Sequence, residues 1–244
     1  MRTLLVDGHV HIHACYDEDV FLSAAEQNLR MAGKGGGEEL PTLMLAEMRE
    51  DNVFARWRAG QCPWPIQTTG EDCSFYLADR LLVIAGRQVV SAEGVEVLAQ
   101  CIAAQYADGR PLNETLAKIQ ATGALVVLPW GVGKWLGRRG KLVTEAARRY
   151  PVLLGDNAGR PSFWSFPAHF RTRPVLCGTD PLALPSQQTL AGSYGFSLTA
   201  PIDLDCPAQS LCKALTKGIS VTPLGRRVSL FTFLYQQLGL RIKR

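Results

Sequence analysis

Apolar residues along this chain fall into short runs, and most runs are followed by glycine, proline or polar residues. The first run is Leu4–Val6, and later runs predict strands at residues 42–46, 74–77, 81–86, 88–90, 95–98, 125–129, 152–154 and 174–177. Between several of these runs, apolar residues recur at spacings of three and four, which is typical of an amphipathic helix. Short buried strands that alternate with helices indicate an α/β protein with a parallel sheet.

The first helix is predicted after the acidic residues 17–19, with Leu22, Ala25 and Leu29 on its apolar face. Further helices are expected at residues 53–62, from about residue 112, and at 143–149. An amphipathic C-terminal helix, residues 229–239, ends in basic residues that complement its dipole, and we expect it to pack on the rest of the chain. The absence of an internal repeat in the sequence predicts one domain, residues 1–244.

Composition narrows the class of protein. The chain has 244 residues, a formal net charge of +4 and no long run of basic residues, so a nucleic-acid partner is not expected. The seven cysteines include no C-x-x-C pair and are expected to be free thiols. We find no signal-peptide pattern and no apolar run of membrane-spanning length, so we expect a cytoplasmic location and no membrane partner. The sequence does not specify an oligomeric state.

An alternating set of histidines follows the first strand, in the segment Asp7-Gly8-His9-Val10-His11-Ile12-His13. Residues two positions apart point to the same face of a strand, so His9 and His11 project their imidazoles in one direction. Two neutral imidazoles on one rigid strand form a good half-site for a divalent transition metal. Asp180, which precedes a proline after a later strand, is by itself a common type of turn residue.

The order of these polar residues resembles the polymerase and histidinol phosphatase (PHP) superfamily. Asp7–His11 is similar to that family's opening D-x-H-x-H motif, and Gly178–Asp180 is similar to its closing G-S-D-x-H motif, in which the aspartate is a metal ligand. The resemblance extends from residue 4 to about residue 195. It implies a distorted (β/α)7 TIM-like barrel and a metal-dependent hydrolase that acts on a phosphoester or another small anionic substrate.

The middle of the chain departs from the pattern of that family. Where the family carries further histidines or a bridging glutamate, this sequence has Met48, Gln88, Trp130 and Leu182. The resemblance therefore implies a reduced site, with His9, His11 and Asp180 as metal ligands and Glu47 or Asp156 as an additional ligand or general base. Such a set can hold one Zn²⁺, Mn²⁺ or Fe²⁺ ion with room for a water, but not three ions.

A second group of candidates concerns anion binding. Residues 131–141 follow a predicted strand directly and combine glycines with four cations, without the spacing of a P-loop. Lys134, and Arg160 after the next strand, are expected to neutralise the substrate and the charge that develops in the transition state. Arg87 is a third candidate for binding the anionic substrate. The same cations are also compatible with a solvated loop or, for Arg87, with a helix interface.

Two other functions stay open at this point. The first is a catalytically inactive barrel that binds a ligand or a protein partner through the same face. The second is an amidohydrolase-type enzyme with a mononuclear metal site, which usually has additional strand-end histidines, whereas His169 falls in a predicted loop. The sequence therefore leaves open whether the chain is an enzyme.

Overall fold

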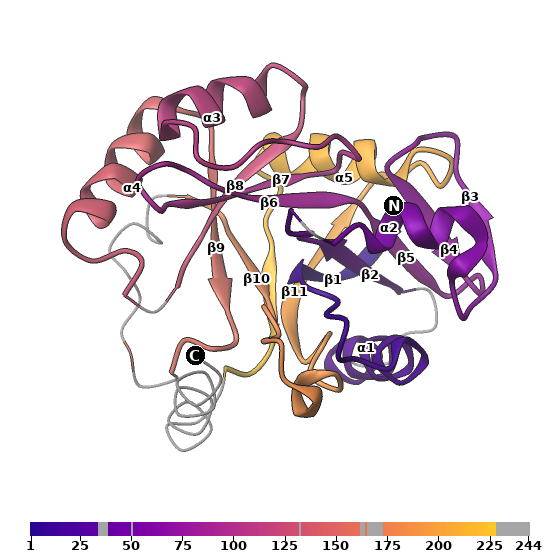
Figure 1. Cartoon of the computed structure of the whole chain (residues 1–244). Helices are drawn as coiled ribbons and strands as arrows, with labels where there is room; N and C mark the ends of the chain where they lie inside the picture. The colour runs from indigo at the N-terminus through magenta and orange to yellow at the C-terminus, as the bar shows by residue number, and fades with distance from the viewer. Residues whose placement is uncertain (34–38, 50, 132, 162–163, 165–172, 228–244) are drawn as a thin grey trace.

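The computed structural model describes residues 1–33, 39–49, 51–131, 133–161, 164 and 173–227. Its strands form two mixed sheets (Figure 1). The larger sheet has the order β12-β11-β1-β2-β5-β4-β3, and the smaller has the order β10-β9-β8-β7-β6. The strands of the larger sheet are β1 (Arg2–Val10), β2 (Leu40–Leu45), β3 (Ile66–Thr68), β4 (Ser74–Leu77), β5 (Leu81–Ile84), β11 (Tyr194–Ala200) and β12 (Thr222–Gly225). Those of the smaller sheet are β6 (Gly86–Val90), β7 (Glu96–Gln100), β8 (Leu125–Pro129), β9 (Leu153–Asn157) and β10 (Val175–Gly178).

Five α-helices are present in the described part of the chain: α1 (Glu18–Ala32), α2 (Val53–Arg56), α3 (Leu112–Gln120), α4 (Gly137–Arg149) and α5 (Pro207–Thr216). In Figure 1, α3 and α4 lie along the outer side of the smaller sheet, and α1 lies beside β1 and β2. Their apolar faces belong to two hydrophobic clusters: one contains residues of both sheets, and the other combines the smaller sheet with α3 and α4. None of the helices in the described ranges has the length and apolar character needed to span a bilayer.

The expected (β/α)7 barrel of the PHP type is wrong, because the strands form two open sheets. Parallel pairing needs a crossover of a dozen or more residues between neighbouring strands. The connections from β4 to β5 and from β6 to β7 are much shorter than that, and both pairs are antiparallel. The run of four predicted strands between residues 74 and 98, with no helix between them, was the sequence signal for these hairpins.

Most other predicted elements are present, with shifted boundaries. The helix expected at residues 53–62 is a short α-helix followed by a π-helical turn, Trp57–Gln61, and the helix expected at 143–149 begins at Gly137. The elements β3, β11, β12 and α5 were not predicted from the sequence pattern. The predicted C-terminal helix, residues 229–239, lies outside the described residues.

Two glycines allow the two sheets to approach each other where β1 meets β10. A Cβ atom on Gly178 would lie 2.4 Å from the backbone nitrogen of His9, and one on Gly8 would lie 2.9 Å from the carbonyl oxygen of Cys177. Side chains at these positions would force the strands apart. The histidine-bearing end of β1 therefore lies directly beside the end of β10.

Candidate metal centre

Asp7 links the end of β1 to the turn that follows β10 by hydrogen bonds. Its carboxylate is buried and accepts hydrogen bonds from the backbone nitrogen of Thr179 at 2.8 Å, the Thr179 hydroxyl at 2.5 Å and the backbone nitrogen of Gly192 at 2.8 Å. Burial raises the pKa of Asp7 to about 6, while these hydrogen bonds act in the opposite direction. Asp7 thus has a structural role: it holds His9 and Asp180 in fixed relative positions.

The side chains of His9, His11 and Asp180 converge on one point. The two Nε2 atoms are 3.0 Å apart, and they lie 3.6 Å (His9) and 3.4 Å (His11) from Oδ1 of Asp180. Asp180 has a φ of 48°, in the left-handed region, and its backbone nitrogen donates to the carbonyl oxygen of His9 at 2.8 Å. An aspartate tolerates this conformation better than most residues. The turn places its carboxylate against the histidines of β1.

The spacing of these three atoms matches that of ligands around one metal ion. Ligand atoms at 2.0–2.1 Å from a tetrahedral Zn²⁺ ion lie about 3.3 Å from one another. The three measured separations bracket that value. The His9–His11–Asp180 group can therefore bind a metal ion, as the sequence analysis predicted.

The ionisation of this group also suits a metal. Burial lowers the pKa of His9 to about 4, although the Asp180 carboxylate acts to raise it. Burial alone would raise the pKa of Asp180, but the charge of His9 and a hydrogen bond from His11 hold it well below its usual range. A neutral imidazole and an ionised carboxylate are the forms that ligate metals.

Two amide side chains support this group, and the sequence analysis gave neither of them a role in it. Asn157, the last residue of β9, donates through Nδ2 to Oδ2 of Asp180 at 2.8 Å and to the carbonyl oxygen of Trp130 at 2.9 Å. The Gln88 side chain hydrogen-bonds His9. Partners of this kind orient metal ligands. The position of Asn157 at a strand end beside Asp156 was the sequence signal for it.

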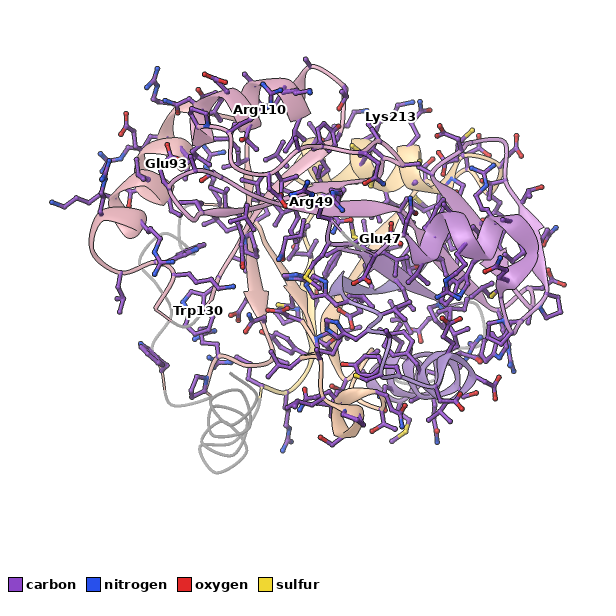
Figure 2. All side chains as sticks on the ribbon, in the orientation of Figure 1. Glu47, Arg49, Glu93, Arg110, Trp130 and Lys213 are labelled. Carbon is purple, nitrogen blue, oxygen red and sulfur yellow. The ribbon has the colours of Figure 1, made fainter. Side chains whose placement is uncertain are left out.

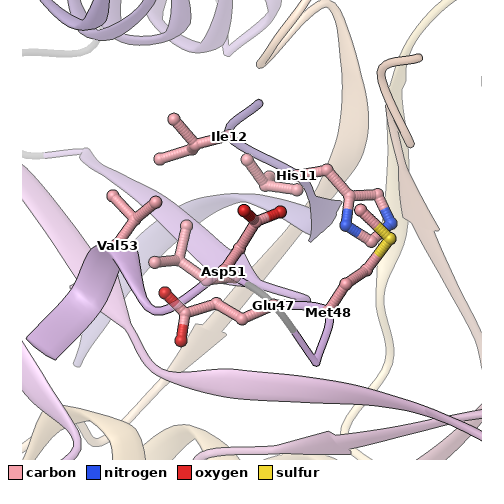
Figure 3. A pocket seen from close by; sticks show the side chains of 8 residues that line it. His11, Ile12, Glu47, Met48, Asp51 and Val53 are labelled. Carbon is pink, nitrogen blue, oxygen red and sulfur yellow. The ribbon is translucent and has the colours of Figure 1, made fainter. Parts of the chain in front are cut away.

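Glu47 lies near His11 but faces another way. Its Oε1 accepts a hydrogen bond from the backbone nitrogen of Phe54 at 2.7 Å, at the start of α2. Figure 3 shows this carboxylate on the Val53 side of a small pocket, of about 10 Å³, while Met48 lies beside the His11 imidazole. Burial raises the pKa of Glu47 to about 7, and the hydrogen bonds from α2 lower it. Within the described ranges, the converging group of ligand atoms does not include Glu47, so its role as ligand or base stays a prediction.

Arg87 is buried between the two sheets. Its Nη1 donates to the carbonyl oxygen of Glu47 at 3.4 Å, and an isolated bridge joins the backbones of the two residues. Because Glu47 follows β2 of the larger sheet and Arg87 belongs to β6 of the smaller one, this bridge joins the two sheets. The anion-binding role expected for Arg87 stays a prediction.

Asp156 and Arg160 bind each other. Nε and Nη2 of Arg160 donate to the two carboxylate oxygens at 2.6 and 2.7 Å, and both side chains are fully buried. Tyr194 donates to the same carboxylate at 2.8 Å, and Nη1 of Arg160 donates to the carbonyl oxygen of Trp164 at 2.7 Å. The structure thus pairs a predicted base with a predicted anion ligand, and the geometry gives both of them a structural role.

Lys134 lies at the edge of the metal group. It forms an ion pair with Glu96, at the start of β7, and its side chain is 40% exposed. Its positive charge acts to lower the pKa of both His9 and Asp180. The predicted cations after Lys134, at positions 138, 139 and 141, belong to α4 rather than to a loop. Among the three predicted anion-binding residues, Lys134 is the one that is not buried, and its anion-binding role stays a prediction.

The fold has counterparts among solved structures. PsfC from Pseudomonas syringae PB-5123 matches over 100% of both chains, with a TM-score of 0.65 and 15% sequence identity. The lesion-specific endonuclease PfuEndoQ from Pyrococcus furiosus matches with a TM-score of 0.54 and 9% identity. An Endonuclease Q complex with a 27-mer duplex substrate, which has an abasic lesion at the active site, matches with a TM-score of 0.52 and 11% identity. These two matches cover 91% of this chain and 57% and 58% of the endonuclease chains.

No protein-family model matches the sequence, and no curated protein matches it. At identities of 9–15%, the structural matches show the fold alone. The resemblance to the PHP superfamily is corrected accordingly. The chain is an α/β protein with two open mixed sheets, similar in fold to PsfC and, more distantly, to Endonuclease Q, and it has a His-His-Asp group that can bind a metal.

Proposed function

We propose that this chain is a hydrolase with a single divalent ion, Zn²⁺, Mn²⁺ or Fe²⁺, and that it acts on a phosphoester or another small anionic substrate. The observation that carries the proposal is the convergence of His9, His11 and Asp180 at distances that fit one ion. When bound, such an ion polarises a phosphoryl oxygen and lowers the pKa of water toward neutrality.

The residues of the chain supply the remaining parts of the proposed reaction. His9, at the end of β1, His11, directly after that strand, and Asp180 would hold the ion. Lys134 reaches the edge of the group, where its ammonium favours an anionic substrate over a neutral one. Two of the structural neighbours are endonucleases, which makes phosphodiesters a substrate class to test beside phosphomonoesters.

The experiment is a hydrolysis assay on metal-stripped protein that is reloaded with Mn²⁺ or Zn²⁺. The substrates are p-nitrophenyl phosphate and bis(p-nitrophenyl) phosphate. We expect hydrolysis that depends on the added metal, is lost in His11→Ala and persists in His13→Ala. His13 is a matched control because it follows on the same segment but hydrogen-bonds the carbonyl oxygen of Pro181 at 2.9 Å instead of joining the group.

Two outcomes would overturn the proposal. If the wild-type chain binds neither metal, the proposed site is not a metal centre. If it binds metal at His9 and His11 but hydrolyses neither substrate, the face is better explained as a ligand-binding site, which was one of the alternatives left open by the sequence.

A further inference from the structure

Asn157 has one polar atom that the hydrogen bonds of the described residues do not satisfy. Its Nδ2 donates to Asp180 and to the carbonyl oxygen of Trp130, whereas its Oδ1 is buried and has no hydrogen-bond partner. Both partners of Nδ2 are acceptors, so the orientation of the amide is fixed and the unpartnered atom is the oxygen. Buried polar atoms without a partner are rare, and they often mark a place where water, an ion or a ligand binds.

The amide group that carries this oxygen adjoins the candidate metal centre through its Nδ2 atom. The Asp180 carboxylate has one oxygen facing the two histidines and the other bonded to Asn157. The Asn157 side chain is therefore separated from the histidine pair by one carboxylate group. Gly159 leaves room beside the oxygen, because a Cβ atom there would lie 3.3 Å from Oδ1.

We infer that Asn157 is a positioning residue with two separate tasks. Its amide N–H groups hold Asp180 in the orientation that presents Oδ1 to the histidines, and its own Oδ1 accepts a hydrogen bond from an O–H group at the site. That O–H group belongs either to water or to a hydroxyl of the substrate. The inference rests on the proposed function, since both tasks serve a metal-loaded site.

The two tasks are separated by two variants. Asn157→Ala removes both the donor and the acceptor, whereas Gly159→Ala keeps the amide and crowds its oxygen. Asn28→Ala is the matched control: Asn28 also donates through Nδ2 to two acceptors, the carbonyl oxygens of Thr189 and Ala191, but not to Asp180. Circular dichroism and thermal unfolding establish that each variant is folded.

The first measurement is the affinity for Mn²⁺, by isothermal titration calorimetry. Loss of a residue that orients a metal ligand typically weakens metal binding by about 10–100-fold. We expect a change of this size in Asn157→Ala and an unchanged affinity in Gly159→Ala and Asn28→Ala. An Asn157→Ala variant that binds Mn²⁺ like the wild type would overturn the first task, whereas a wild-type chain that binds no Mn²⁺ would overturn the proposed function as well.

The second measurement identifies the O–H group. If it is water, Gly159→Ala changes the water-proton relaxation rate of the Mn²⁺-loaded protein in the absence of substrate. If it is a substrate hydroxyl, relaxation is unchanged and KM rises for glycerol phosphate but not for p-nitrophenyl phosphate. If neither quantity changes, Oδ1 is not an acceptor at the site and the second task is overturned.

Discussion

The last two residues of β9 belong to two neighbouring polar clusters of opposite character. Asp156 joins the cluster of Arg160 and Tyr194, in which each carboxylate oxygen is bonded and the charges cancel. Asn157 joins the His9–His11–Asp180 group, in which three ligand atoms converge and one buried oxygen has no partner. Consecutive strand residues point to opposite faces, so the chain builds both clusters from adjacent positions.

The difference between the clusters shows how a binding site is recognised among buried charges. The Asp156 carboxylate accepts three hydrogen bonds from an arginine and a tyrosine, and the arginine already balances its charge. The Asp180 carboxylate instead faces two imidazoles at about ligand spacing and has no lysine or arginine as an ion-pair partner among the described residues. Position in the fold alone does not separate the two, since both lie at the ends of neighbouring strands.

The largest effect is expected when the cluster of Asp156, Arg160 and Tyr194 is broken. Arg160→Met leaves the buried Asp156 without its charge partner, and the loss of one partner of a buried ion pair costs about 3–5 kcal/mol. We expect a loss of unfolding free energy of this size in urea titrations. The double variant Asp156→Asn, Arg160→Met should recover part of it, because no buried charge then remains.

The matched change in the other cluster is Asp180→Asn, measured without metal. It should cost less stability than Arg160→Met, since Asp180 is partly exposed and its opposite charges are not permanent. Equal losses of unfolding free energy in the two variants would show that both clusters are structural. The proposed difference between the two clusters would then be wrong.

A second prediction concerns Glu47 and tests whether its buried carboxylate is fully compensated by its partners, as that of Asp156 is. Its pKa is about 7 in the folded chain against an ordinary value of 4.5, so the folded state binds more protons than the unfolded state between these pH values. Stability contributed by this group is therefore lost as pH rises from about 4.5 to 7, by at most about 3 kcal/mol.

We expect the free energy of unfolding of wild type to fall relative to that of Glu47→Gln over this range, in urea titrations at pH 5, 6, 7 and 8. The amide retains an oxygen that accepts from α2 but has no charge to desolvate. Parallel pH profiles of the two proteins would mean that folding does not raise the pKa of Glu47.

The smallest expected effect concerns the role of Lys134. Lys134→Ala removes a half-exposed cation near the metal group, with an electrostatic contribution of about 1 kcal/mol, or roughly fivefold in affinity. Binding of inorganic phosphate to the metal-loaded chain should weaken by about that factor, and binding of the metal itself should tighten slightly, because a repelling charge is lost. Lys213→Ala, on α5 (Figure 2), should change neither. Equal shifts in the two variants would indicate a general charge effect.

The alternation of His9 and His11 predicted that their imidazoles share a direction, and the resemblance to the PHP superfamily, rather than a local pattern, added Asp180 as a candidate ligand. The structure brings these three side chains together in a group that can bind a metal. The partners of Asp156 could not be predicted from these patterns. Arg160 lies four residues later in a turn, and Tyr194 comes from a strand, β11, that the sequence analysis did not identify.

The barrel was predicted from the order of polar motifs, which does not report how strands pair. Pairing depends on connection length and on backbone approach, such as the contact that Gly178 permits between β10 and β1. The supporting residues were missed for a related reason. Gln88 and Asn157 are neutral, and neutral amides become recognisable as parts of a site when their hydrogen-bond partners are known.

The most direct test of the account is the stoichiometry of metal binding, measured by titrating the metal-stripped chain with Zn²⁺ and with Mn²⁺. The account predicts one ion per chain in the wild type and one in the His13→Ala variant. In a folded double variant that carries both His9→Ala and His11→Ala, it predicts that metal binding is lost. Binding that survives this double substitution, or a wild type that binds no ion, would contradict it.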